Sequence, residues 1–132
     1  MKTYWDSSAL IQALHDTNMR SRIKPGEHGT RPHSLAEVFS TLTKGVNFRY
    51  VPADAARMIT DLVNDLDFVE LSAADALGAV KQASSQGVRG ARIHDLMHAT
   101  AAAKYGAGLL LTLDDSGFGT LKLPASIKAT RP

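Results

Sequence analysis

Four acidic residues from distant parts of the chain have the types and positions that could support phosphodiester chemistry. They are Asp6, Glu37, Asp95 and Asp114. Asp6 and Asp114 each follow a short apolar segment, whereas Glu37 and Asp95 lie within apolar, helix-forming segments, where an unpartnered carboxylate is costly to bury. Four carboxylates that converge would repel one another unless a cation lies among them. The pattern therefore suggests a phosphodiesterase that depends on Mg²⁺ or Mn²⁺.

Short apolar segments that alternate with helical ones predict the strands that position these acids. The expected strands cover residues 2–5, 68–71, 109–113 and, in the tail, 121–123. Strands alternating with helices indicate an α/β fold, with a mostly parallel sheet of four to five strands covered by helices on both faces. Binding sites in such sheets form at the carboxyl ends of the strands, where Asp6 and Asp114 are expected.

Helix-capping residues and apolar spacing predict five helices. Ser7 and Ser8 are expected to cap the first, and Ser34 the second, which stops by Gly45. Pro52 is expected in the first turn of the third helix and Ser72 at the cap of the fourth. The fifth helix is expected at about 91–105, and residues 16–33 should form an irregular or partly helical connection.

Composition limits the class of protein. The chain has 132 residues, of which 44% are hydrophobic and 21% charged, and this fits one globular domain over residues 1–132. It has no cysteine, which excludes disulfides, thiolate metal sites and cysteine nucleophiles. No apolar run approaches the roughly 20 residues of a membrane span, and an acid at position 6 precedes any signal-peptide core. We expect a cytoplasmic protein that does not enter a membrane.

Charge is distributed unevenly along the chain. The net charge is only +2, but residues 20–49 hold six cations against the two acids Glu27 and Glu37. The six are Arg20, Arg22, Lys24, Arg31, Lys44 and Arg49. A basic surface beside an acidic site suits an enzyme that acts on a polyanion, although a solvated surface explains the same charges.

Several local patterns occur together in an order typical of one family. Residues 4–10, residues 93–102 and residues 111–114 carry it: an Asp-Ser-Ser sequence after a strand, an Asp in an alanine-rich helix, and Thr-x-Asp after a strand. With these segments the chain resembles the PIN-domain ribonucleases, and by its length the VapC-like toxins of bacterial toxin–antitoxin pairs. The resemblance covers nearly the whole chain and implies a PIN-like fold.

The resemblance also implies an activity and a site. It implies a metal-dependent endoribonuclease that hydrolyses RNA, with Mg²⁺ (or Mn²⁺) bound by Asp6, Asp95 and Asp114, and by Glu37 directly or through water. It further implies a cognate antitoxin protein and a homodimer. Ser7 or Ser8 and Thr112 match hydroxyls that support the site in the family. The chain departs from the family at Leu113, where a polar or basic residue is common, and Asp115 competes with Asp114 as the fourth acid.

Other interpretations stay open for these residues. The chain could be a non-catalytic PIN-like module that binds RNA or protein, or a phosphoaspartate protein, although the Asp-x-Asp expected of a related phosphatase is missing. Asp6 could cap a helix, Glu37 could form a capping box with Ser34, and Asp95 could pair with Arg92. His94 and His98 have chelating spacing, but the glutamate of His-Glu-x-x-His is absent. We therefore favour hydrogen-bonding or surface roles for the histidines.

Overall fold

The computed structural model describes residues 1–132 and contains one sheet of five parallel strands. In chain order the strands are β1 (Lys2–Trp5), β2 (His28–Thr30), β3 (Asp67–Phe68), β4 (Ala107–Leu111) and β5 (Lys128–Thr130). Their order across the sheet is β3-β2-β1-β4-β5, so the first strand lies at the centre. The α/β class and the parallel sheet predicted from the sequence are confirmed.

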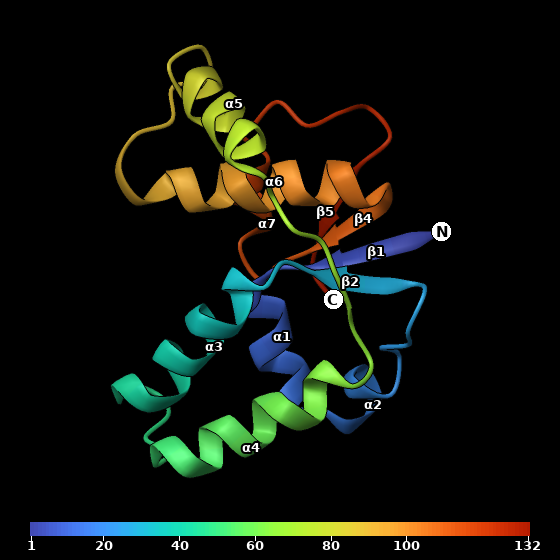
Figure 1. Cartoon of the computed structure of the whole chain (residues 1–132), viewed down its shortest axis with the longest axis vertical. Helices are drawn as coiled ribbons and strands as arrows, with labels where there is room; N and C mark the ends of the chain where they lie inside the picture. Colours follow the sequence, from blue (N-terminus) through green and yellow to red (C-terminus); the bar gives the residue numbers. More distant parts are fainter.

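Helices cover both faces of this sheet, as predicted. They are α1 (Ser7–Leu14), α2 (Thr17–Arg20), α3 (His33–Lys44), α4 (Pro52–Val63), α5 (Ala73–Ala83), α6 (Ile93–Tyr105) and α7 (Asp115–Phe118), and a 3₁₀ turn, η1 (Gly90–Arg92), precedes α6. Figure 1 shows α1 to α4 below the sheet and α5 and α6 above it. None of the helices is long and apolar enough to pass through a membrane.

The two faces of β1 anchor two separate hydrophobic cores. Successive side chains of a strand point to opposite faces, so the neighbours Tyr4 and Trp5 enter different cores, and both are fully buried. Tyr4 packs with residues of α5, α6 and β4, including Leu96 and Leu110. Trp5 packs with residues of α1, α3 and α4, including Leu10. The central strand therefore contributes a large aromatic side chain to each core.

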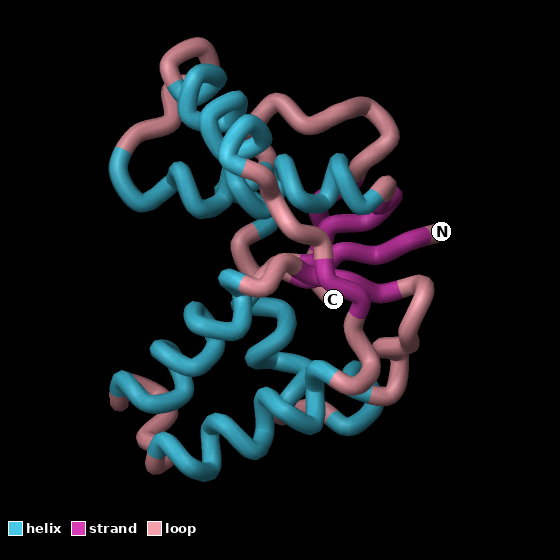
Figure 2. Tube along the Cα trace, viewed as in Figure 1, coloured by secondary structure: helices cyan, strands magenta, loops and turns pink.

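Some strands differ from the sequence prediction, as the trace in Figure 2 shows. The segment 28–30 forms β2, although the prolines and glycines around it suggested an irregular connection. The tail strand lies at 128–130 and not at 121–123, where Leu121 instead packs into a core. Strand β3 is Asp67–Phe68 and shares only Phe68 with the strand predicted at 68–71. Strand β4 is Ala107–Leu111, so it begins and ends two residues earlier than the predicted 109–113. These strands are short, so their positions depend more on pairing with a neighbouring strand than on the strand propensity of their residues.

The helix ends also correct two predictions. Asp6, and not Ser7 or Ser8, is the N-cap of α1, because its side chain accepts a hydrogen bond from the Ala9 amide. Ser34 lies inside α3, where the N-cap position belongs to Pro32 without a side-chain bond. The predicted cap at Ser72 is confirmed, and it forms a capping box with Asp75.

Candidate active site at the carboxyl ends of the strands

Asp6 lies at the carboxyl end of the central strand and is almost fully buried, with 6% of its surface exposed. Its Oδ1 atom accepts hydrogen bonds from the Ala9 amide at 2.9 Å and from the Ser8 hydroxyl at 2.7 Å. The Ser8 hydroxyl in turn accepts a bond from the Leu113 amide at 3.0 Å, across the neighbouring strand end. The Oδ1 atom of Asp6 thus holds the loop between β1 and α1 in place, and no protein group donates a hydrogen bond to the Oδ2 atom.

Asp114 follows β4, the strand that pairs with β1 so that Trp5 lies opposite Leu111. Its amide donates to the Thr112 hydroxyl at 3.0 Å, and its Oδ1 atom accepts from the Gly117 amide at 3.1 Å, which caps α7. Asp114 is exposed, and its second oxygen has no hydrogen-bond donor from the protein. The parallel register of β1 and β4 therefore brings the Asp6 and Asp114 loops together at one edge of the sheet.

Asp95 lies in the first turn of α6, partly buried. Burial raises the pKa of its carboxyl group, and the negative charges of Asp114 and Asp6 raise it further, against the opposing charges of His98 and Arg92. No ion pair joins Asp95 to Arg92, whose guanidinium donates instead to the Gly117 carbonyl at 3.1 Å. Asp95 is thus near enough to Asp114 and Asp6 for their negative charges to disfavour its ionised form.

Glu37 has a different partner from the other three acids. Its Oε1 atom lies 3.0 Å from Nε2 of the buried His98 on α6, and Nδ1 of the same ring lies 2.8 Å from the Tyr4 hydroxyl on β1. Burial acts to raise the pKa of Glu37, but the hydrogen bond and charge of His98, together with the charges of Arg31 and His33, outweigh it, so the pKa lies below its ordinary value. The predicted capping box with Ser34 does not form, because Ser34 pairs with Thr30.

Oxygen-only ligands with free carboxylate oxygens suit a hard divalent cation such as Mg²⁺ or Mn²⁺. Asp6, Asp95 and Asp114 have this chemistry, and their mutual repulsion is what a cation would relieve. However, no group of three or more His, Asp or Glu side chains is arranged closely enough to hold a metal ion as it stands. Mg²⁺ usually keeps several of its waters in a protein and is held by one or two carboxylates, so it would not need three of them around it.

The remaining candidates have structural partners. Asp115 forms an ion pair with Arg131, whose Nε atom lies 3.2 Å from its Oδ1 atom, so it is directed toward the tail. His94 stacks on His33 of α3, with ring centroids 6.1 Å apart, and does not act together with His98. A cavity of about 800 Å³ between α5, α6 and residues 120–124 contains none of the four acids.

Sequence reasoning underrated two residues near this site. His98 was considered only as a chelator or a general hydrogen-bonding residue, although its position three residues after Asp95 places it on the same side of α6. Tyr4 was treated as part of an apolar strand, but its hydroxyl holds His98. A buried polar atom needs a partner, and this is the signal that could have linked the two residues.

The fold and the positions of Asp6 and Asp114 define a class of protein. Its members are small α/β proteins with a parallel sheet and carboxylates at the carboxyl ends of the central strands. A family model described as the PIN domain matches residues 3–121. The chain therefore belongs to the PIN-domain family, as its motifs predicted. No curated protein shows significant sequence similarity to it.

Solved structures share the fold at low sequence identity. PAE2754 from Pyrobaculum aerophilum superposes with a TM-score of 0.71 at 18% identity, covering 92% of this chain and 86% of that one. VapBC2 from Rickettsia felis, solved bound to a DNA fragment from its promoter, gives a TM-score of 0.72 at 14% identity, covering 100% and 99%. VapBC-1 from nontypeable Haemophilus influenzae gives 0.68 at 16% identity, covering 99% and 98%.

Proposed function

We propose that this protein is a metal-dependent endoribonuclease and the toxin component of a toxin–antitoxin pair. What supports the proposal most is the convergence of Asp6, Asp95 and Asp114 at one edge of the sheet in a chain of the PIN-domain family. The fold that it shares with VapBC proteins supports the toxin assignment. A cytoplasmic location, a protein antitoxin and a homodimer belong to the same proposal.

The chain's own residues have separate tasks in the proposed reaction. Asp6, Asp95 and Asp114 would hold Mg²⁺ or Mn²⁺, Ser8 keeps the Asp6 and Leu113 loops in register, and Glu37 orients the attacking water. A divalent ion supplies positive charge that acidifies water and stabilises charge on the phosphate. The oxygen of the water attacks phosphorus in line, forms the new bond to it and loses a proton to solvent. The bond from phosphorus to the 3′ oxygen breaks, and that oxygen takes up a proton, so the products carry 5′-phosphate and 3′-hydroxyl ends.

Substitution of Asp6 tests the proposal directly. An Asp6→Asn variant keeps an oxygen that can cap α1, and it removes one of the charges that repel Asp95, so the metal-free protein should be at least as stable as the wild type. Cleavage of labelled single-stranded RNA should require Mg²⁺ or Mn²⁺ in the wild type and be lost in the variant. Both proteins should be purified in parallel, so that a contaminating nuclease would appear in both.

The alternative, a non-catalytic module that binds RNA or protein, gives a different result in the same experiment. Such a module would show no cleavage by the wild type at any metal concentration, whatever its affinity for RNA. Metal binding gives an independent measurement: at a concentration 100 times its dissociation constant, a cation stabilises the fold by about 2.7 kcal/mol. The melting temperature of the wild type should therefore rise with Mn²⁺, and that of Asp6→Asn should rise less.

A further inference from the structure

Arg31 is a buried cation without a counter-ion, located immediately after β2 and before α3. Only 9% of its surface is exposed, and its Nε atom is fully buried without a hydrogen-bond partner. No carboxylate forms an ion pair with its guanidinium; Glu37 and Tyr4 are near enough for its charge to lower the pKa of both groups. A buried charge that lacks a partner costs folding free energy, and an anionic ligand would offset that cost.

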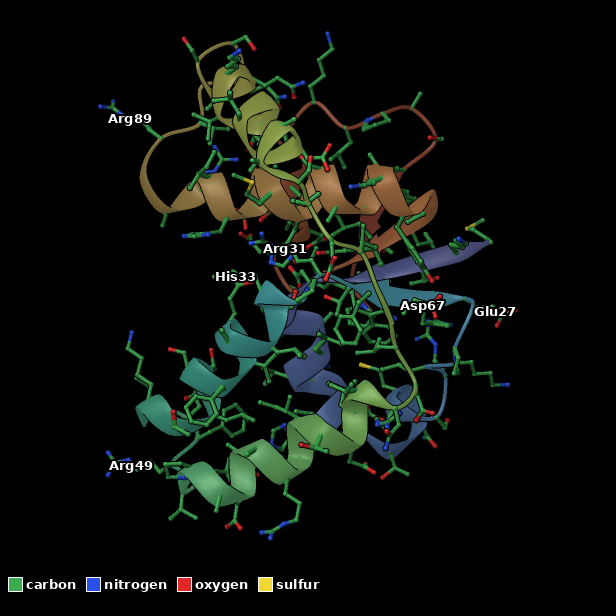
Figure 3. The ribbon with its side chains drawn as sticks, in the orientation of Figure 1. Glu27, Arg31, His33, Arg49, Asp67 and Arg89 are labelled. Atoms are coloured by element: carbon green, nitrogen blue, oxygen red, sulfur yellow. The ribbon has the colours of Figure 1, made fainter.

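Arg31 also lines a cavity at the carboxyl ends of β2 and β3. The cavity has a volume of about 300 Å³ and is lined by Arg31, Pro32, His33, Glu70 and Leu71. Figure 3 shows Arg31 and His33 at the start of α3, with Arg31 between that helix and α6, which carries Asp95. A ligand at this edge of the sheet would reach the largely buried Arg31 through this cavity.

The chemistry of this cavity selects an anion with several oxygens. A guanidinium offers parallel N–H donors that match phosphate, and it binds more strongly where water is excluded. His33 is an exposed second nitrogen donor on the rim. Glu70 lines the cavity too and opposes an anion, but it is exposed, so solvent screens its charge more than that of Arg31.

We propose that Arg31 binds a backbone phosphate of the RNA, adjacent to the phosphate that is cleaved. The inference rests on the proposed function and adds a binding site to it. The carboxylates repel the substrate, and a cation set deep beside them holds the strand against that repulsion. Because Arg31 contacts a neighbouring phosphate and not the scissile one, it acts in binding. It positions the RNA relative to Asp6, Asp95 and Asp114.

Binding of RNA without cleavage tests this proposal separately from the nuclease activity. The parent protein carries Asp6→Asn, and its affinity for fluorescein-labelled single-stranded RNA is measured by anisotropy in buffer with Mg²⁺. Adding Arg31→Gln should weaken binding about tenfold, the loss expected for charge-assisted hydrogen bonds to one phosphate. The slope of log affinity against log salt should also become shallower by about 0.7.

Arg89→Gln is the matched control. Arg89 is exposed, lies in the loop before η1 and points away from the sheet in Figure 3, so losing its charge should change affinity less than about twofold. Arg31→Lys keeps the charge without the fork of donors and should recover part of the affinity. Circular dichroism melts should show Arg31→Gln at least as stable as its parent, because the substitution removes an unpaired buried charge.

Equal RNA affinities for the Arg31→Gln and Arg89→Gln proteins would overturn the proposal, and so would a failure of the parent to bind RNA at all. An acidic peptide that binds the parent but not Arg31→Gln, with RNA affinity unchanged, would instead identify a protein carboxylate as the ligand. Wild-type cleavage is measured separately, so a protein that binds RNA through Arg31 but never cleaves it would contradict only the nuclease assignment.

Discussion

The Nε2 atom of His98 lies 3.0 Å from the Oε1 atom of Glu37, although 61 positions separate the two residues in the chain. The opposite ring nitrogen of His98 meets the Tyr4 hydroxyl at 2.8 Å. A single buried imidazole thus joins α3, α6 and the central strand, directly behind the acidic edge. It also holds the Glu37 side chain in one orientation, since only 3% of the His98 side chain is exposed.

Removing this imidazole should destabilise the protein more than neutralising its partner. His98→Leu leaves the buried Tyr4 hydroxyl and the Glu37 carboxylate without their bonds, a loss of about 1–3 kcal/mol in the free energy of unfolding. Glu37→Gln keeps an acceptor for His98 and should cost less than about 1 kcal/mol, while RNA cleavage falls. Urea denaturation of both variants measures the difference, and equal losses would contradict the buried role of His98.

Asp95 should make the folded protein less stable as its carboxyl group ionises. Burial and the charges of Asp114 and Asp6 raise its folded-state pKa, so the folded protein holds this proton more tightly than the unfolded chain does. The stabilising effect of the proton is complete below the unfolded pKa of 3.8 and is lost as the pH rises through the folded value. Asp95→Asn should therefore stabilise the metal-free protein at pH 7, by less than about 1 kcal/mol because the site is partly solvated. The free energies of unfolding of the wild type and Asp95→Asn should become equal near pH 3. A difference between them that stays constant with pH would exclude ionisation of Asp95 as its cause.

Asp114 and Asp115 should differ sharply in their effect on cleavage. The negative charge of Asp114 raises the pKa of Asp95, whereas Asp115 forms an ion pair with Arg131. Asp114→Asn should reduce metal-dependent cleavage at least 100-fold, as expected for a group that holds the metal ion, which supplies several kcal/mol to the reaction. Asp115→Asn should leave the rate within about threefold, since it loses only an exposed ion pair of small free energy. Each variant removes one negative charge, so the two are matched in charge. A larger loss of cleavage in Asp115→Asn would make Asp115, and not Asp114, the fourth acid.

Two glycines, in the strands on either side of β1, should respond differently to a methyl group. A Cβ atom on Gly29 in β2 would lie 2.8 Å from the ring of Tyr105, whose hydroxyl donates to Asp67. On Gly108 in β4 the nearest atoms, at 2.7 Å, belong to the flexible and exposed side chain of Met1. Gly29→Ala should therefore cost about 1–3 kcal/mol through overpacking, whereas Gly108→Ala should be nearly neutral. Thermal unfolding of the pair measures this, and a tolerated Gly29→Ala would mean that the ring moves freely.

The sequence predicted the parts of the fold that depend on strong local signals. The capping box at Ser72, the proline in the first turn of α4 and the first strand were all placed correctly. Strand β2 was missed because its three residues, His28, Gly29 and Thr30, have little strand propensity and gain their structure by pairing with β1 and β3. The tail strand was misplaced for a similar reason, since Leu121 and Leu123 pack on a core instead of pairing.

The sequence indicates where the candidate acids lie in the fold but not which side chains they contact. Strand ends and helix starts place Asp6, Asp95 and Asp114 at one edge, because parallel strands share a direction. The contact of Glu37 with His98 joins side chains from two helices that are distant in sequence, and no spacing rule connects them. Arg31 was one of six cations in a basic segment, and only its burial distinguishes it from the others.

The central position of β1 has a consequence for how the protein is made. Strand β1 pairs with β2 on one side and with β4 on the other, and β4 is synthesised long after β1, with α1 to α6 between them in the chain. The hydrogen bond between the Tyr4 hydroxyl and His98 also cannot form until α6 has been synthesised. Contacts so distant in sequence slow folding. The Asp6 and Asp114 loops therefore cannot come together before β4 has been synthesised, and any activity that depends on both of them must wait for that strand.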